Sequence, residues 1–251
     1  MASIQNLDLI ELLSGKKGSK LKKIMRAVNE QSRDGRADYV RGLANETLDS
    51  LDKILSVSRN PPPVEYPDSE LGRRLKLAGQ MVSGDYPARI LYLSQGGYDT
   101  HGGEDTRFPA LMRDLGLALT GLYHDLADIW DDVLVVTMSE FGRTSQENGI
   151  RGIDHGEASL CFAMGGAVNG GVYNCNRNNW SNGDLFSTSN GRYVAHRSDY
   201  RNLYNEILSR HLGDPDDQMD SIIPDYASPV SYTHLRAHET DSYLVCRLLL
   251  E

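Results

Sequence analysis

Three short segments rich in glycine carry the residue types that bind metal ions in proteins. The first reads Gly-Tyr-Asp-Thr-His-Gly over residues 97–102, the second Ser-Glu-Phe-Gly-Arg over 139–143, and the third Gly-Ile-Asp-His-Gly over 152–156. Carboxylate oxygens and imidazole nitrogens together suit a divalent ion such as zinc, with manganese, iron or calcium as alternatives. The pattern therefore predicts a metal site whose ligands are Asp99, His101, Glu140, Asp154 and His155.

Each motif has a simpler interpretation when it is taken alone. An isolated Asp-X-His is frequent in proteins, and its histidine is commonly a hydrogen-bonded loop residue. Glu140 could instead cap the turn that follows it, and the pair Asp154 and His155 could form a surface turn. The metal hypothesis depends on the three motifs occurring together, in order, at predicted strand ends.

Arg143 follows Glu140 by three positions and suggests the chemistry that such a site would perform. Its planar guanidinium could bind a tetrahedral phosphoryl or sulfuryl oxyanion. A nearby metal ion would polarise that group and lower the pKa of bound water toward about 7. A salt bridge from Arg143 to a local acid such as Glu147 is the alternative of equal weight.

Two apolar runs and the helical pattern between them are predicted to position the first two motifs. Residues 89–93 and 133–138 are predicted strands, and the second is typical of a strand buried on both faces. Leucines every three or four positions predict a long helix over residues 107–130. Strand, helix and strand form the crossover of an α/β sheet, in which ligands bind beyond the carboxyl ends of the strands.

Further elements follow and precede this unit. A third strand is predicted at residues 160–164, a hairpin turn at Asn169–Gly170, and a helix at 199–212. Amphipathic spacing predicts helices within 21–56 and over 70–82, separated by consecutive prolines that break regular structure. We therefore divide the chain into a helical segment 1–60, a linker and helix 61–88, an α/β domain 89–228 and a tail 229–251.

Composition limits the classes of partner. The 251 residues carry a formal net charge of −9 and a pI near 5.3, which argues against nucleic-acid binding. No run approaches the roughly 18 apolar residues of a membrane span, and residues 1–23 lack the order of a secretory signal. The three cysteines have neither zinc-knuckle nor disulfide-scaffold spacing, so we interpret them as free thiols, with a disulfide between Cys161 and Cys175 as the alternative.

Residues 230–251 resemble a translated sequencing adapter more than natural protein. Back-translated in one frame, residues 230–240 read as a transposase adapter and residues 244–251 as a flow-cell adapter, with a sample barcode at 241–243. We therefore expect the natural sequence to be interrupted near Pro229 and exclude three residues of the tail as candidates, His234, His238 and Cys246. A basic C-terminal helix is the alternative.

The order of the motifs resembles the domain-of-unknown-function family 1501 (DUF1501), a sulfatase-like branch of the alkaline phosphatase superfamily. The resemblance covers residues 21–226 and rests on Gly-Tyr-Asp-Thr-His-Gly, the long helix, Val-Val-Thr-Met-Ser-Glu-Phe-Gly-Arg-Thr, and Asp-His-Gly before an apolar strand. It implies an alkaline-phosphatase-like, mostly parallel sheet flanked by helices, and a metal-dependent hydrolase of small anionic phosphate or sulfate esters. Asp99 and His101 match the first ligand pair, Glu140 the second group and His155 a later histidine.

Two features depart from the superfamily pattern. The second group is usually Asp-His, whereas this sequence has Glu140-Phe141. The change removes one nitrogen ligand, so a site for two metal ions would lack one of its ligands. No segment before Arg89 resembles the first strand of the superfamily, which carries a metal-binding acid and a Ser or Thr nucleophile. The resemblance therefore implies the C-terminal portion of a longer protein, exported in many members through a twin-arginine signal. A non-catalytic exported binding or structural module with the same fold is the alternative function.

Overall fold

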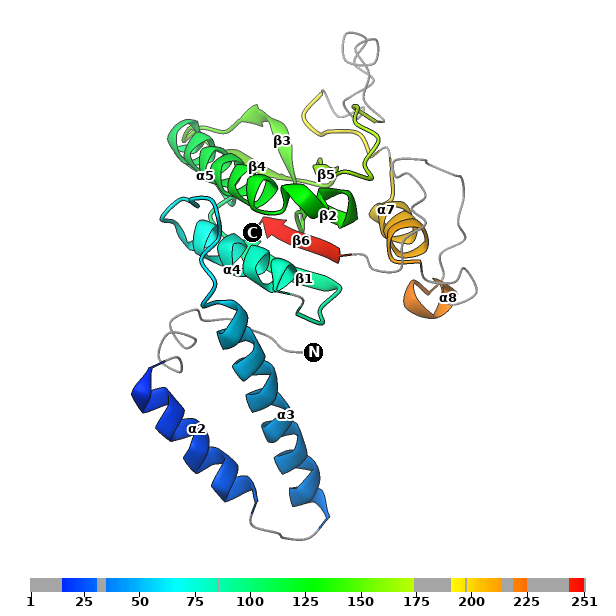
Figure 1. Cartoon of the computed structure of the whole chain (residues 1–251). Helices are drawn as coiled ribbons and strands as arrows, with labels where there is room; N and C mark the ends of the chain where they lie inside the picture. The colour runs from blue at the N-terminus through cyan, green and yellow to red at the C-terminus, as the bar shows by residue number, and fades with distance from the viewer. Residues whose placement is uncertain are drawn as a thin grey trace. The chain divides into compact units, whose positions relative to one another are not determined.

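The structure of the chain is a computed structural model (Figure 1), which describes residues 15–30, 35–84, 86–173, 191–196, 198–213, 219–224 and 244–250. The chain divides into two compact units. The first comprises residues 1–63 and 76–87, and the second comprises residues 64–75 and 88–251.

Two helices, α2 (Lys16–Asn29) and α3 (Arg36–Val57), lie side by side in the first unit (Figure 1). Arg26 of α2 reaches two carboxylates of α3, with Nη1 2.8 Å from Asp49 and Nη2 2.9 Å from Asp52. These pairs are partly exposed, so each contributes little to stability while it fixes the register of the two helices. The predicted helical region 21–56 is therefore confirmed as two helices joined by polar contacts.

Helix α4 (Glu70–Ser83) confirms the predicted second amphipathic helix. In the first unit, the buried Gln80 donates from Nε2 to the carbonyl of Ser58 at 2.9 Å, which ties α4 to the end of α3. In the second unit, Arg74 donates to the carbonyl and hydroxyl of Ser94.

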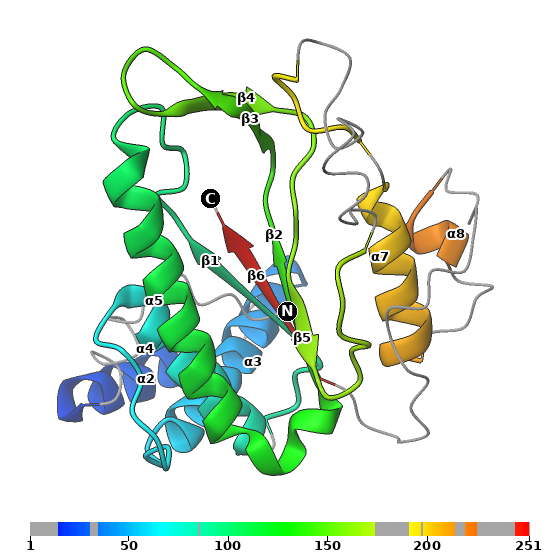
Figure 2. The same ribbon diagram turned by 90° about the horizontal axis from the view of Figure 1, so that it is seen from above.

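The main sheet of the second unit has the strand order β1 (Ile90–Gln95), β6 (Leu244–Leu250), β2 (Val133–Met138) and β5 (Ala163–Gly165). β6 pairs in parallel with both β1 and β2, and β5 pairs antiparallel to β2 (Figure 2). A separate antiparallel pair is formed by β3 (Gly142–Glu147) and β4 (Ile153–Gly156).

The predicted α/β class is confirmed as a mixture of helices and short strands, but a mostly parallel sheet is not established. Both parallel pairings involve β6, and the other two pairings are antiparallel. β6 belongs to the tail that we excluded on its sequence, yet its backbone lies between β1 and β2. The foreign origin of that tail stays a prediction.

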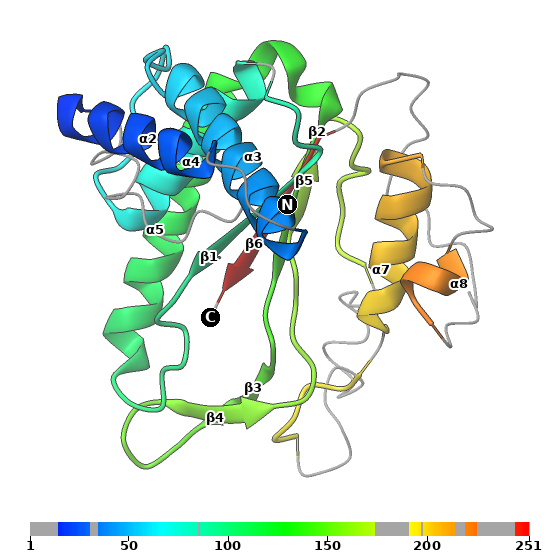
Figure 3. The ribbon, with the colours of Figure 1, turned by 90° about the horizontal axis from the view of Figure 1, so that it is seen from below.

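Helices cover β2 from two sides. Leu134 and Val136, which alternate along β2, pack in one apolar cluster with Ile207 and Leu212. The latter two residues follow α7 (Tyr200–Glu206): Ile207 begins a π-helical turn, and Leu212 is the C-cap of that turn. α5 (Glu104–Asp125) lies on the opposite side of β2 (Figures 2 and 3), and a short 3-10 helix (Ala127–Asp132) connects it to β2. Strand β2 therefore has the burial on both faces that its β-branched sequence predicts, with Val133 to Val136 all at most 2% exposed.

The segment after β2 differs from its prediction in two places. The third strand is shorter than predicted, because only residues 163–165 pair with β2. The turn that follows lies at 165–168, where Val168 N donates to the carbonyl of Gly165 at 3.1 Å, so the turn predicted at Asn169–Gly170 was misplaced. A last short helix, α8, spans Met219–Ile222.

Candidate metal centre

The carboxyl ends of β1 and β2 lie at the same edge of the sheet, because both strands run parallel to β6. The chain leaves β1 into the loop 96–103, which carries Asp99 and His101. It leaves β2 into the β3–β4 pair, whose second strand carries His155. Two loops that are about fifty residues apart in sequence therefore meet at one edge, as the sequence predicts.

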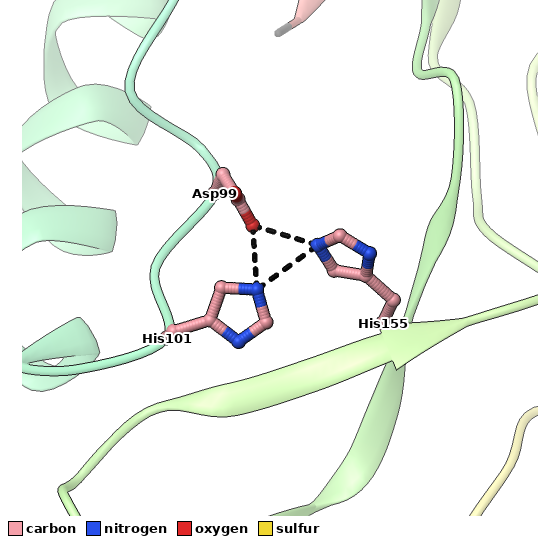
Figure 4. Close-up of side chains that lie close together, drawn as sticks. All are labelled: Asp99, His101 and His155. Atoms are coloured by element: carbon pink, nitrogen blue, oxygen red, sulfur yellow. Dashed lines mark hydrogen bonds and ion pairs between the residues drawn. The ribbon is translucent and has the colours of Figure 1, made fainter.

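Three side chains from these loops converge on one point (Figure 4). The Nε2 atom of His155 lies 2.9 Å from Asp99 Oδ1 and 3.0 Å from His101 Nε2, and His101 Nε2 lies 3.1 Å from Asp99 Oδ1. About half of each side chain is exposed, at 52% for Asp99, 46% for His101 and 49% for His155. One carboxylate oxygen and two imidazole nitrogens thus form a compact, accessible triangle.

Backbone hydrogen bonds lock the two loops together behind this triangle. The amide of Ile153 donates to the carbonyl of Thr100 at 3.3 Å, and the amide of Glu104 donates to the carbonyl of Arg151 at 2.9 Å. Gly152 allows the closest approach, since a Cβ atom there would lie 2.1 Å from the carbonyl carbon of His101. Only glycine fits this contact without moving the loops.

Arg143 links the same two loops through its guanidinium, and its side chain is only 17% exposed. Its Nη1 donates to the carbonyl of Ile153 at 2.6 Å, and its Nη2 donates to the carbonyl of Tyr98 at 2.6 Å and to Asp99 Oδ1 at 3.0 Å. The acid that it pairs with is Asp99 and not Glu147. Arg143 therefore holds Asp99 of the triangle in place, and its predicted role in binding a substrate oxyanion stays a prediction.

The surroundings favour an ionised Asp99. The hydrogen bond from His155 and the nearby charges of His101 and Arg143 lower the pKa of its carboxyl below the ordinary value, against a smaller opposing effect of burial. An ionised carboxylate is the form that coordinates a metal ion.

Comparison with known families identifies the family to which the chain belongs. A family described as "Protein of unknown function (DUF1501)" matches residues 42–223, which is most of the sequence. The chain belongs to the DUF1501 family. No curated protein and no solved structure matches it significantly. Among the described residues of this DUF1501 chain, no helix is both long and apolar enough to cross a membrane.

Asp154 is separate from the triangle in this DUF1501 member, although the sequence predicts it as a ligand. Its Oδ1 lies 3.5 Å from Nδ1 of His101, on the side of the ring away from Asp99 and His155, and accepts a hydrogen bond from Asn148 Nδ2 at 3.2 Å. These bonds, with that of Asn148 as the largest cause, lower the pKa of the Asp154 carboxyl.

Arg192 is the site residue that sequence reasoning missed. Its Nη2 lies 2.8 Å from Asp154 Oδ2, and the segment around it adds to β3 through a bridge between Tyr193 and Thr144. The amide of Ser145 also donates to the carbonyl of Arg192 at 2.8 Å. No motif in the sequence marks this residue, because it approaches the site only through pairing with β3.

Phe141 stacks on the His155 ring, with centroids 3.8 Å apart and an angle of 23° between the planes. The guanidinium of Arg143 lies 5.4 Å from the centroid of Phe141. Phe141 thus gives the His155 ring of this DUF1501 chain an apolar support.

Glu140 is exposed and does not belong to the triangle, so its predicted role as a ligand stays a prediction. His124 and His196 also lie outside the triangle and are exposed. His211, at the end of the π-helical turn, is buried at 1% exposure.

Proposed function

We propose that this DUF1501 chain binds a divalent metal ion, in the first place zinc, through Asp99, His101 and His155, and that the bound ion serves the hydrolysis of phosphate or sulfate esters. We also propose that the chain is related to the sulfatase-like branch of the alkaline phosphatase superfamily. The observation that carries it is the convergence of Asp99 Oδ1, His101 Nε2 and His155 Nε2 within 3.1 Å of one another.

The size of the triangle supports this assignment. With zinc–nitrogen and zinc–oxygen distances of about 2.0–2.1 Å, two ligands of a tetrahedral site are separated by about 3.4 Å. The three atoms in the structure are 2.9–3.1 Å apart, so a separation increase of a few tenths of an ångström admits the ion. A site with three protein ligands leaves a coordination position for water or substrate, which is the pattern of catalytic zinc sites.

In the proposed ester hydrolysis, the metal ion and the side chains of the site have different roles. A bound divalent ion would polarise an ester oxygen and lower the pKa of bound water toward about 7. Asp99 provides the negative charge that binds the cation, and Arg143 and the stacked ring of Phe141 hold Asp99 and His155 in position. The half-exposed ligands leave access for a small anionic ester.

The test is hydrolysis of aryl phosphate and aryl sulfate esters by the purified chain with added zinc, manganese or calcium. The hypothesis expects metal-dependent turnover that disappears in the His101→Ala, His155→Ala double variant. His124→Ala is the matched control, because this histidine is exposed and lies outside the triangle. Turnover that is equal in the double variant and the control would contradict the assignment.

A non-catalytic metal-binding or structural module is the second candidate function. Two features support it: Phe141 occupies the position at which the superfamily resemblance implies a nitrogen ligand, and Glu140 remains outside the triangle. Metal bound by the triangle without turnover of either ester class would support this module over the hydrolase.

A further inference from the structure

One side of helix α2 contacts α3 through polar side chains. Asn29 Nδ2 donates to Asn45 Oδ1 at 3.0 Å, and Lys22 pairs with Asp52. Arg26 forms two further ion pairs with carboxylates of α3. Since Lys22, Arg26 and Asn29 recur every four or three positions, they share one side of α2. The side of α2 that faces α3 is therefore polar.

The apolar side chains of α2 lie on another side of the helix and are exposed. They are spaced by three, one and three positions, which places them along one stripe of the helix surface. This apolar stripe consists of Leu21 (46% exposed), Ile24 (51%), Met25 (42%) and Val28 (59%). A single exposed apolar residue is ordinary, but a contiguous set marks an interaction surface. In the part of the chain that the structure describes, α3 does not cover this stripe.

Lysines border the apolar stripe. With 3.6 residues per turn, the stripe lies between the side that faces α3 and a row formed by Lys16, Lys20 and Lys23. Lys17 precedes Leu21 by one turn and lies in line with the stripe. Among the described residues, none of these four exposed lysines forms an ion pair with an acid. The helix is thus strongly basic in a chain whose formal net charge is −9.

We propose that α2 docks onto an anionic lipid bilayer, with the apolar stripe inserted below the headgroups and the four lysines against the lipid phosphates. A helix with this composition lies in the plane of the bilayer surface, because its apolar side chains enter the acyl boundary while its cations remain with the anionic headgroups. The flexible stems of lysine allow the charges to reach the headgroups from beside the stripe. The inference is independent of the proposed metal site and of ester hydrolysis.

The charge of α2 favours a lipid surface over two other occupants. A second copy of the chain docked on the same face would bring two sets of lysines together, and like charges in contact repel. Nucleic acid would bind the lysines through its phosphates but would leave the apolar stripe in water. An anionic bilayer complements both the lysines and the stripe.

Flotation of the full chain with lipid vesicles tests this assignment. Vesicles of phosphatidylglycerol and phosphatidylcholine in equal parts are compared with vesicles of phosphatidylcholine alone. Each lysine near an anionic surface strengthens binding by a factor of roughly five, so we expect binding to the anionic vesicles to be at least about tenfold stronger. Added salt should weaken this binding, because it screens the lysines from the lipid phosphates.

The contribution of the apolar stripe is measured with the Ile24→Gln, Val28→Gln double variant. Glutamine favours the helix and keeps the charge, so the variant loses only apolar surface. We expect binding to the anionic vesicles to weaken by at least about tenfold. Val40→Gln with Leu43→Gln is the matched control, since both residues are exposed apolar positions of α3.

The contribution of the charges is measured with the Lys16→Gln, Lys20→Gln, Lys23→Gln triple variant, which should also weaken binding by at least about tenfold. The control removes the same number of positive charges from exposed positions elsewhere in the first unit, Lys53→Gln, Arg59→Gln and Lys76→Gln. Circular dichroism of every variant checks that the helix content is that of the wild type.

Two results overturn the assignment. The first is wild-type chain that does not bind the anionic vesicles, and the second is loss of binding in the controls equal to that in the α2 variants. If vesicles are not bound, a dimer in sedimentation that Ile24→Gln with Val28→Gln dissociates would assign the stripe to a second copy. Vesicle binding that appears only after deletion of residues 2–14 would assign the stripe to that segment. The vesicles contain neither metal nor ester substrate, so absence of hydrolysis would refute the proposed function alone.

Discussion

Replacing Gly152 by alanine tests whether the proposed metal site depends on close contact between its two loops. A Cβ at position 152 would lie 2.1 Å from the carbonyl carbon of His101 and 2.2 Å from its oxygen, whereas ordinary contacts begin at 3.4 Å. The obstacle is backbone, so the loops themselves must separate by about 1 Å. Gly152 has no positive φ, so the effect comes from this contact and not from backbone conformation.

The size of the expected effect follows from the triangle. Functional sites tolerate displacements of about 0.5 Å. The loop separation of about 1 Å that a Cβ at position 152 requires would move His101 away from His155 by more than this tolerance. We therefore expect Gly152→Ala to weaken zinc binding by at least about tenfold, comparable to loss of a supporting residue. Overpacking at this contact should also lower the free energy of unfolding by about 1–3 kcal/mol.

Isothermal titration with zinc and urea unfolding measure these two effects. Gly149→Ala is the control from the same loop, because a Cβ there meets no atom within 4 Å. If Gly152→Ala and Gly149→Ala both retain the wild-type affinity and stability, the loops do not meet as described and the reasoning is refuted.

Three other predictions follow from the structure. Arg143→Lys should reduce the free energy of unfolding in urea by about 1–3 kcal/mol, because the single nitrogen of lysine cannot take the places of both Nη1, which donates to Ile153, and Nη2, which donates to Tyr98 and Asp99. Unchanged stability would contradict the linking role of Arg143. Burial raises the pKa of Tyr98 to about 12, so its neutral form stabilises the fold fully below pH about 10, and this contribution should be lost as pH rises through 12. Absorbance titration of wild type against Tyr98→Phe measures that ionisation, and a Tyr98 midpoint near 10 would contradict the burial. Deleting residues 230–251 removes the strand that pairs with both β1 and β2, so the melting temperature should fall, whereas an unchanged melting temperature would support a foreign tail.

Elements with strong local patterns could be predicted from the sequence. The β-branched run 133–138 became β2 with the same bounds, and the leucine spacing after residue 107 became the greater part of α5. The convergence of Asp99, His101 and His155 followed from strand ends that share one edge of a sheet. These features depend on chain direction and periodicity, which a sequence contains.

The finer organisation of the site depends on contacts that a sequence does not specify. In the extended chain after β2, alternate residues point to opposite sides, and the pattern does not say which alternate set faces the site. Phe141 and Arg143 face it, whereas Glu140 does not belong to the triangle. Asp154 could be predicted near His101, but the end of the imidazole that it meets is determined by the packing of β4.

The position of β6 shows a different limit of sequence reasoning. The tail was excluded because its sequence resembles an adapter, but its leucine-rich segment 244–250 also satisfies the pairing requirements of a central strand. Backbone pairing is largely independent of side-chain identity, so the composition of a segment alone does not decide whether a sheet accepts it.

The most direct test of the central claim is X-ray absorption spectroscopy of the zinc-loaded chain, together with its metal content. We expect one zinc ion per chain, coordinated by two imidazole nitrogens and a carboxylate oxygen at about 2.0–2.2 Å. The His101→Ala, His155→Ala double variant should retain almost no zinc, and His124→Ala should retain as much as the wild type. Zinc retained equally by the double variant, or no zinc retained by the wild type, would contradict a metal site formed by Asp99, His101 and His155.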